Sequence, residues 1–227
     1  MITYFAQKTR LDTCEDSLTS TVFDGLKYLP TEIFWKILKK ALYHDKLPYS
    51  CGEMKEMSFW EHWSAKDIED HTNFVEPDVF IRFKEIDIII EAKRLNERQQ
   101  DMTQLRNEIM AYNNEFLTDD KALYFVQLGG LADKNDIEDY IDDRHQSGAI
   151  ICKTDWTRLL DAMVTENKHL KTHNLSTSMA YSRILDDIIK GMELHQYYKK
   201  NWLADLKIDN YINECSLKNL FDYARCK

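Results

Sequence analysis

The sequence predicts an α/β protein in which a mixed β-sheet is flanked by helices and followed by a helical C-terminal part. Two β-prone segments, residues 78–83 and 86–93, are separated by only two residues, which is typical of a hairpin. Two further runs, 122–128 and 149–153, are almost entirely apolar, as buried strands are. Helical spacing of apolar residues precedes the hairpin and dominates from residue 154 onward.

Ahead of the hairpin, the sequence predicts one helix over residues 16–29 and a second, capped by Thr31, that ends near residue 42. The connection 44–73 contains proline and glycine and is rich in Met and Trp. We expect it to be irregular, with one short helix near residues 59–63.

The helices expected after the hairpin cover residues 96–116, 136–145, 156–164 and 174–197. The second of these is short and acidic, and Gly129-Gly130 ends the strand before it. We divide the chain into a core, residues 1–165, and a helical extension, residues 166–227, that packs on the core or on a partner.

The composition is that of a globular protein: 44% of the 227 residues are hydrophobic, 30% are charged, and only six are Gly and three Pro. No apolar run approaches the roughly 20 residues that span a bilayer, and the N-terminal residues do not resemble a secretion signal. We therefore expect a cytoplasmic protein without membrane contact. The five cysteines are scattered, which favours free thiols over structural zinc.

The net charge of −9 argues against a protein that coats nucleic acid, because such proteins carry a basic excess. It does not exclude a nuclease, which collects carboxylates for its metal and needs only a local basic strip for the phosphates.

The hairpin is the most informative segment. A fold-back at Lys84-Glu85 places only apolar residues on one face: Val79, Ile81, Phe83, Ile86, Ile88, Ile90 and Ala92. On the other face Asp78 lies opposite Glu91, with Lys93 two residues further along. Opposed Cβ atoms are about 4.5–5.5 Å apart and like charges there are destabilising. A divalent cation between the two carboxylates would offset this repulsion. The alternative is a solvent-facing hairpin whose acids pair with neighbouring cations.

Pro77-Asp78, separated by twelve residues from Glu91-Ala92-Lys93, resembles the PD-(D/E)XK motif of restriction-endonuclease-like nucleases. The resemblance implies a restriction-endonuclease-like core. It also implies that Asp78, Glu91 and the backbone carbonyl of Ala92 bind Mg²⁺, for which Mn²⁺ can substitute. Lys93 then orients or activates the attacking water.

Two flanking segments also resemble elements of this family. Gln104 resembles a Gln that some branches place beside the active site, and Gln100, Gln104, Glu108 and Tyr112 share one helix face. The alternative is a solvated face. Glu15 resembles a Glu of the first helix that reaches the metal, although a carboxylate is also favoured at any helix N-terminus.

The function implied by the resemblance is a metal-dependent nuclease acting on DNA, with RNA as the alternative substrate. Arg94, Arg98 and Arg106 are candidates for phosphate contacts, or ordinary helix-surface charges. By analogy we expect a bacterial restriction or phage-defence role, with a homodimer or a partner subunit. The rival interpretation is an inactive nuclease-fold module that binds nucleic acid or protein. A phosphate-binding enzyme is disfavoured because no suitable Gly-rich loop is present.

Overall fold

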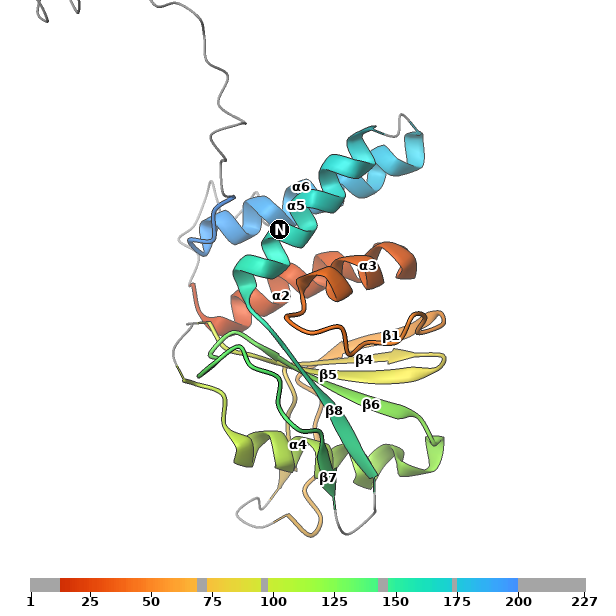
Figure 1. Ribbon diagram of the computed structural model, residues 1–227, viewed down its shortest axis with the longest axis vertical. Coiled ribbons are helices and arrows are strands. Elements are labelled where there is room, and N and C mark those ends of the chain that lie inside the picture. The colour runs from red at the N-terminus through yellow and green to blue at the C-terminus, as the bar shows by residue number, and fades with distance from the viewer. Residues whose placement is uncertain (1–12, 69–72, 95–97, 143–146, 173–174, 200–227) are drawn as a thin grey trace, which may run out of the picture.

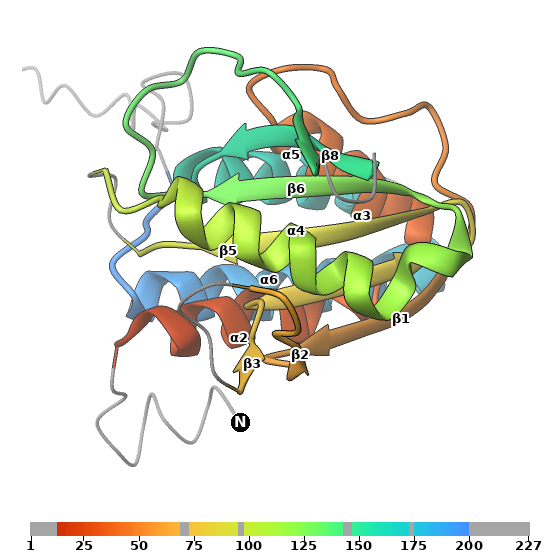
Figure 2. The same cartoon turned by 90° about the horizontal axis from the view of Figure 1, so that it is seen from below.

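The computed structural model describes residues 13–68, 73–94, 98–142, 147–172 and 175–199, and its parts form three layers (Figure 1). A sheet lies in the middle, with α4 on one face and the other helices on the opposite face (Figure 2). The helices are α2 (Glu15–Leu26), α3 (Thr31–Ala41), α4 (Met102–Phe116), α5 (Trp156–Thr172) and α6 (Ser176–Leu194), and the 3-10 turn η1 (Leu117–Asp119) follows α4.

The sheet has the strand order β1-β4-β5-β6-β8-β7. Its strands are β1 (Met54–Phe59), β4 (Val79–Phe83), β5 (Ile86–Ala92), β6 (Ala122–Leu128), β7 (Tyr140–Asp142) and β8 (Ser147–Thr154). A separate two-stranded ribbon joins β2 (Trp63–Ser64) to β3 (Phe74–Val75). The β5–β6 and β6–β8 pairs are parallel and the other pairs are antiparallel, which confirms a mixed sheet in an α/β fold.

The predicted hairpin register is confirmed. Val79 pairs with Ile90, and Arg82 pairs with Asp87, in the antiparallel β4–β5 ladder. The residues predicted for the apolar face all lie in the core between the sheet and α2, α3, α5 and α6: Val79, Ile81, Phe83, Ile86, Ile88, Ile90 and Ala92. This sorting fixes the register because a slip by one residue would move every one of these side chains out of that core.

The solvent-facing alternative for the hairpin is wrong, because the second face is covered by α4. Phe80 and Ile89 pack there against Leu105 and Ile109 of the helix, and all four are buried. A carboxylate on this face is therefore removed from water, and its surroundings determine its charge state.

The expected short helix near residues 59–63 is wrong: β1 occupies residues 54–59 and pairs with β4. A bulge between Met54 and Glu56 shifts the register. Met54 and Met57 therefore both pack against the core between the sheet and α2, α3, α5 and α6, although they are three residues apart. That spacing hides the two-residue alternation of a strand. Thr31 does not cap α3 either; Pro30 is the N-cap, and the Thr31 hydroxyl accepts a hydrogen bond from the Met54 N–H at 3.0 Å.

The acidic helix expected over residues 136–145 is also wrong, since Tyr140–Asp142 is strand β7 on the sheet edge. The acids serve tertiary contacts instead. Lys46 Nζ lies 2.7 Å from Asp136 and 3.1 Å from Asp139, and the Asp139 carboxylate also accepts the Ile151 N–H of β8 at 3.2 Å. These contacts draw the segment onto the sheet. Residues 143–146 lie outside the described residues.

The C-terminal helices pack on the core. Leu185, Ile188 and Ile189 of α6 are buried in the helix-side core, and α6 contacts both α2 and α5. The predicted boundary at residue 165 falls inside α5, which continues to Thr172. Residues 200–227, on which part of the predicted extension falls, lie outside the described residues, and no described helix is long and apolar enough to cross a bilayer.

Candidate active site

The predicted catalytic residues meet at one end of the β4–β5 hairpin. Glu91 and Ala92 are the last residues of β5, and Asp78 directly precedes β4, so the confirmed register places Asp78 opposite Glu91. The Ala92 N–H donates to Asp78 Oδ2 at 2.8 Å, which ties the first acid to the end of the neighbouring strand. Asp78 and Glu91 thus belong to the same face, toward α4.

Lys93 is brought to the same point. Its ammonium group donates to Glu91 Oε1 and lies 3.5 Å from Glu15 Oε1. Glu15 is the first residue of α2, and its other oxygen accepts the Arg94 N–H at 2.7 Å. Glu15 therefore contacts the strand end that carries Lys93, rather than only occupying a helix N-terminus.

The polar stripe of α4 faces inward, so the solvated-face alternative is wrong for these residues. Gln104 Nε2 donates to Glu91 Oε1 at 2.7 Å, and Gln100 Nε2 donates to the carbonyls of Glu91 and Gly129, both at 3.1 Å. Glu108 is fully buried one turn further along α4. Four-residue spacing within α4 keeps Gln104 and Glu108 on one helix face, whereas Gln100 precedes the N-cap Asp101, because the helix begins at Met102 and not near residue 96 as predicted.

The pKa values of three carboxyl groups at the site, those of Asp78, Glu91 and Glu108, are raised. Burial, and then the charge of Glu91, raises the pKa of Asp78 to about 7. Burial also raises the pKa of Glu91, although the neighbouring Lys93 charge opposes the change. Burial followed by the charge of Glu91 raises the pKa of Glu108 well above its ordinary value. For Lys93, burial lowers the pKa but the Glu91 charge outweighs it, so the ammonium form is favoured.

The donor atoms suit a hard cation. Glu91 Oε2 is buried without a hydrogen-bond partner, and Asp78 supplies the second carboxylate of an all-oxygen set. Mg²⁺ typically takes one or two carboxylates and completes its shell with waters and phosphate. Asp78, Glu91 and the Ala92 carbonyl fit this pattern. Across the described part of the chain, no three His, Cys, Asp or Glu side chains are grouped as ligands, and Glu15 is directed to the Arg94 N–H.

From the sequence, no chemical role was assigned to the residues beside Glu91 on the next two strands. In the parallel register Gln127 of β6 pairs with Glu91, and Lys153 of β8 pairs with Gln127. Both side chains are buried, and the Lys153 ammonium lies 2.9 Å from the Asn135 carbonyl. The available signal was a polar residue near the end of each apolar strand, at matching positions.

Gly129 and Gly130 were also missed as parts of the site. Both have positive φ, +75° and +61°. A Cβ on Gly130 would lie 2.6 Å from Lys93 Cβ, and one on Gly129 would lie 2.2 Å from the Lys93 carbonyl oxygen. Only glycine allows this close approach, and the Gly-Gly pair directly after a buried strand was the signal.

The three arginines predicted as candidates for phosphate contacts, Arg94, Arg98 and Arg106, differ in their surroundings. The Arg94 guanidinium is half-buried and donates to the Thr13 carbonyl, so it helps hold the segment before α2. Arg98 and Arg106 are exposed. These two remain candidates for phosphate contacts.

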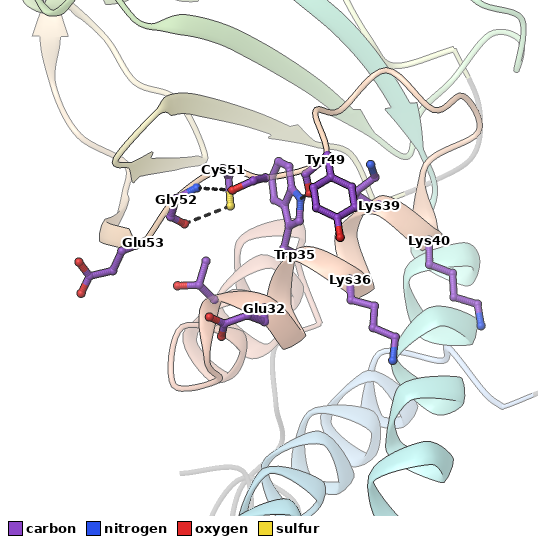
Figure 3. Close-up of a pocket in the computed structure, with 11 residues that line it drawn as sticks. Glu32, Trp35, Lys36, Lys39, Lys40, Tyr49, Cys51, Gly52 and Glu53 are labelled. Atoms are coloured by element: carbon purple, nitrogen blue, oxygen red, sulfur yellow. Dashed lines mark hydrogen bonds between the residues drawn. The ribbon is translucent and has the colours of Figure 1, made fainter.

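A pocket of about 920 Å³ lies elsewhere, between α3 and the segment before β1 (Figure 3). It is close to the β4–β5 turn, because the Glu85 N–H donates to the Cys51 carbonyl at 3.2 Å. Two of its lysines are engaged: Lys36 pairs with Glu166 at 2.6 Å, and Lys39 donates to the Pro48 carbonyl at 3.1 Å. None of the predicted site residues lines it.

Comparison with known proteins gives few relatives. No protein-family model matches the chain. The uncharacterized protein PM0110 of Pasteurella multocida (strain Pm70) is 30% identical over 209 residues, which cover 88% of this chain and 77% of that protein. A solved structure, the refined half-complex from the tetradecameric assembly of Thermococcus gammatolerans McrB AAA+ hexamers with bound McrC, matches at 14% identity over 59% of this chain and 28% of that chain, with a TM-score of 0.28. A TM-score this low does not indicate a shared fold.

Proposed function

The chain belongs to the same family as the Pasteurella multocida protein, and we propose that it is a divalent-cation-dependent nuclease that hydrolyses phosphodiester bonds in DNA. One observation carries the proposal. Asp78 and Glu91 occupy opposed positions on adjacent strands beneath α4, with the Lys93 ammonium in contact with Glu91. The resemblance to PD-(D/E)XK nucleases implies that the two acids bind a metal and that the lysine lies next to them. The placement of these three residues is compatible with those roles.

Each side chain has a distinct task in this proposal. Asp78, Glu91 and the Ala92 carbonyl would hold Mg²⁺, which would polarise a phosphate oxygen and make a nearby water more acidic. Lys93 orients the attacking water and balances the negative charge that develops on the phosphate. Gln104 fixes the orientation of Glu91 through the Oε1 contact. Exposed Arg98 and Arg106 are available for the phosphates on either side of the cleaved bond.

The direct test is a digestion panel of plasmid DNA, single-stranded DNA and RNA with Mg²⁺ or Mn²⁺. Wild-type protein is compared with Lys93→Ala and Asp78→Ala, and Lys66→Ala, which removes an exposed lysine, is the matched control. We expect cleavage by wild type and Lys66→Ala, and loss of cleavage in the two site variants. Retained activity in both site variants would remove the assignment, and cleavage of RNA alone would change the substrate class.

The alternative function is an inactive nuclease-fold module that binds nucleic acid or a protein. It is favoured by one observation: Glu91 Oε1 already accepts from both Lys93 and Gln104, which gives the acid partners without a metal. A thermal shift separates the two functions. A cation that binds only the folded state raises its stability, so the nuclease gains stability with Mg²⁺ or Mn²⁺ while Asp78→Ala does not.

The biological setting we propose is a bacterial restriction or phage-defence system in which a partner subunit, or a second copy of the chain, supplies specificity. The bacterial relative is compatible with this setting. The net charge of −9 also supports a partner, because an acidic chain gains little affinity for DNA from its overall charge. Co-purification of the natively expressed chain followed by mass measurement tests it.

A further inference from the structure

The strand end that carries Lys93 is held from four directions. The Lys93 N–H donates to the Leu128 carbonyl at 2.8 Å, and the Lys93 carbonyl accepts from Trp156 Nε1 at 2.9 Å. The Arg94 N–H donates to Glu15, as described above, and its carbonyl accepts from the Tyr197 hydroxyl. Both peptide groups of this two-residue segment are therefore satisfied, by β6, α5, α2 and the chain directly after α6.

The Tyr197 contact comes from the helical extension, far from the hairpin in sequence. The C-terminal cap of α6 positions the Tyr197 side chain. In this cap the Tyr197 N–H donates to the Met192 carbonyl and the Gln196 N–H donates to the Glu193 carbonyl, both at 3.0 Å. This pair of bonds defines a Schellman motif, in which the residue between helix and turn adopts a left-handed conformation. Gln196 has that conformation, with φ +71°.

Gln196 is an unusual residue for this position, because glycine takes a positive φ without steric cost. A non-glycine residue there is strained, and such residues persist where the surrounding structure holds them. Here the next residue, Tyr197, is held by its hydrogen bond to the Arg94 carbonyl. The Trp156 and Tyr197 rings are 6.3 Å apart, so the two donors that reach the Lys93–Arg94 segment also pack against each other.

The same cap reaches the first turn of α2. His195 is buried, its Nδ1 lies 2.9 Å from the Gly191 carbonyl of α6, and its Nε2 lies 2.8 Å from Ser17 Oγ. Ser17 lies two residues after Glu15, within the first turn of α2. The cap of α6 therefore contacts α2 through His195 and the end of β5 through Tyr197. These two elements carry Glu15 and Lys93, whose charged groups lie 3.5 Å apart.

We propose that the α6 cap, residues 195–197, is part of the catalytic machinery and that Tyr197 is a positioning residue for Lys93. The inference rests on the proposed nuclease function for the role of Lys93. It assigns the helical extension a task within the site, namely to hold the strand end at a fixed distance from α2. Because the Tyr197 hydroxyl donates to the backbone carbonyl of Arg94, its effect reaches the lysine through the position of the chain and not through charge.

The test compares Tyr197→Phe with Tyr198→Phe in the full chain. Each removes one hydroxyl, and Tyr198 is 65% exposed, so it is the matched control. The first readout is amide hydrogen exchange at Lys93 and Arg94, which requires no activity. We expect exchange at these two amides to accelerate about tenfold in Tyr197→Phe, the factor for loss of one hydrogen bond, and to stay unchanged in Tyr198→Phe.

The second readout is steady-state DNA cleavage together with Mn²⁺ affinity. A positioning role predicts that Tyr197→Phe lowers kcat about tenfold and leaves KM and the Mn²⁺ Kd within twofold of wild type. A purely structural role would lower the amount of folded enzyme and leave kcat per folded molecule unchanged.

The outcomes are separable. Unchanged exchange at Lys93 and Arg94 in Tyr197→Phe overturns the inference, and so does faster exchange with an unchanged kcat. Absence of cleavage by the wild-type protein overturns the proposed nuclease function instead, while the exchange readout still decides whether the cap holds the strand end.

Discussion

Asp87 and Glu91 lie on the same strand and on the same face of the sheet, both buried beneath α4, yet their surroundings are opposite in charge. Asp87 has no exposed surface, and cations and a hydroxyl group donate to it. Its donors are Tyr112 Oη at 3.0 Å, Lys121 Nζ at 3.1 Å and Arg82 Nη2 at 3.3 Å. This carboxylate is fully compensated.

Glu91 is also nearly fully buried, but two other acids lie close to it. Lys93 is the cation that contacts it directly, while Asp78 lies opposite and Glu108 lies above on α4. One Glu91 oxygen and both Glu108 oxygens are buried without a hydrogen-bond partner. The pKa values of all three acids are raised, first by burial.

We interpret the contrast as one between a structural acid and a candidate catalytic acid. At Asp87 the fold supplies the cations that a buried carboxylate needs, so the cluster stabilises the folded chain. At Glu91 the fold brings acids together and leaves part of their charge unmatched, which costs stability unless a cation or protons are bound. Perturbed acids of this kind concentrate at functional sites. The two positions should therefore respond to substitution in opposite ways.

The largest expected difference is in catalysis. Glu91→Gln keeps the shape of the side chain and removes its charge, so we expect DNA cleavage with Mg²⁺ to fall by about 10³-fold. Stability in the absence of divalent cations should not fall, because the substitution also removes repulsion from Asp78. Cleavage assays and thermal unfolding measure the two effects. Wild-type activity in Glu91→Gln would contradict the assignment of a catalytic role to Glu91 and a structural role to Asp87.

Asp87→Asn should show the reverse pattern. It leaves Arg82 and Lys121 without their buried counter-charge, and breaking a buried ion pair in this way costs about 3 kcal/mol. We expect urea unfolding to report that loss, while kcat measured well below the unfolding temperature stays within about threefold of wild type. A stability equal to that of wild type would show that the cluster is not the stabilising feature described above.

The sequence predicted those parts of the site that depend on short-range pattern. Alternation along β4 and β5 fixes which side chain opposes which, and so places Asp78 opposite Glu91 without knowledge of the rest of the fold. Four-residue spacing on α4 likewise directs Gln104 and Glu108 to one face. Whether Asp78, Glu91, Ala92 and Glu15 bind a metal stays a prediction.

The parts that escaped prediction depend on long-range contacts. Trp156 and Tyr197 reach the Lys93–Arg94 segment across 63 and 103 residues of sequence, and nothing in their local pattern specifies a hydrogen bond to that backbone. Strand β1 escaped for a different reason. The bulge next to Met54 breaks its alternation, and the register that reveals it belongs to its partner β4.

A smaller effect is expected at the glycine that adjoins Lys93. Gly130→Ala introduces a Cβ at φ +61° and 2.6 Å from Lys93 Cβ, so we expect a stability loss of about 1–2 kcal/mol and a kcat reduced about tenfold. Gly52→Ala is the matched control at the other end of the hairpin, where φ is +72° and the new Cβ meets Lys84 at 2.8 Å. It should cost similar stability and leave kcat unchanged. Equal losses of kcat in both variants would contradict a specific effect on Lys93.

The smallest expected effect is a pH dependence of stability that we assign to Asp78, at the Glu91 end of β5. The pKa of Asp78 is about 7 in the folded chain and about 3.9 when unfolded, so the folded state binds more protons between these values. The stabilisation is complete below about pH 4 and is lost as the pH rises through about 7.

Without divalent cations, the free energy of unfolding should therefore fall by about 1 kcal/mol between about pH 6 and 7.5. Asp78→Asn has no proton to lose and should show a shallower slope over this interval. Added Mg²⁺ should oppose the loss, since a cation replaces the protons that the acids release. Urea unfolding at several pH values, in chelator and in Mg²⁺, measures all three curves. If Asp78→Asn keeps the wild-type slope, the titrating group lies elsewhere, and the raised pKa of Asp78 does not distinguish this end of β5 from the Asp87 end.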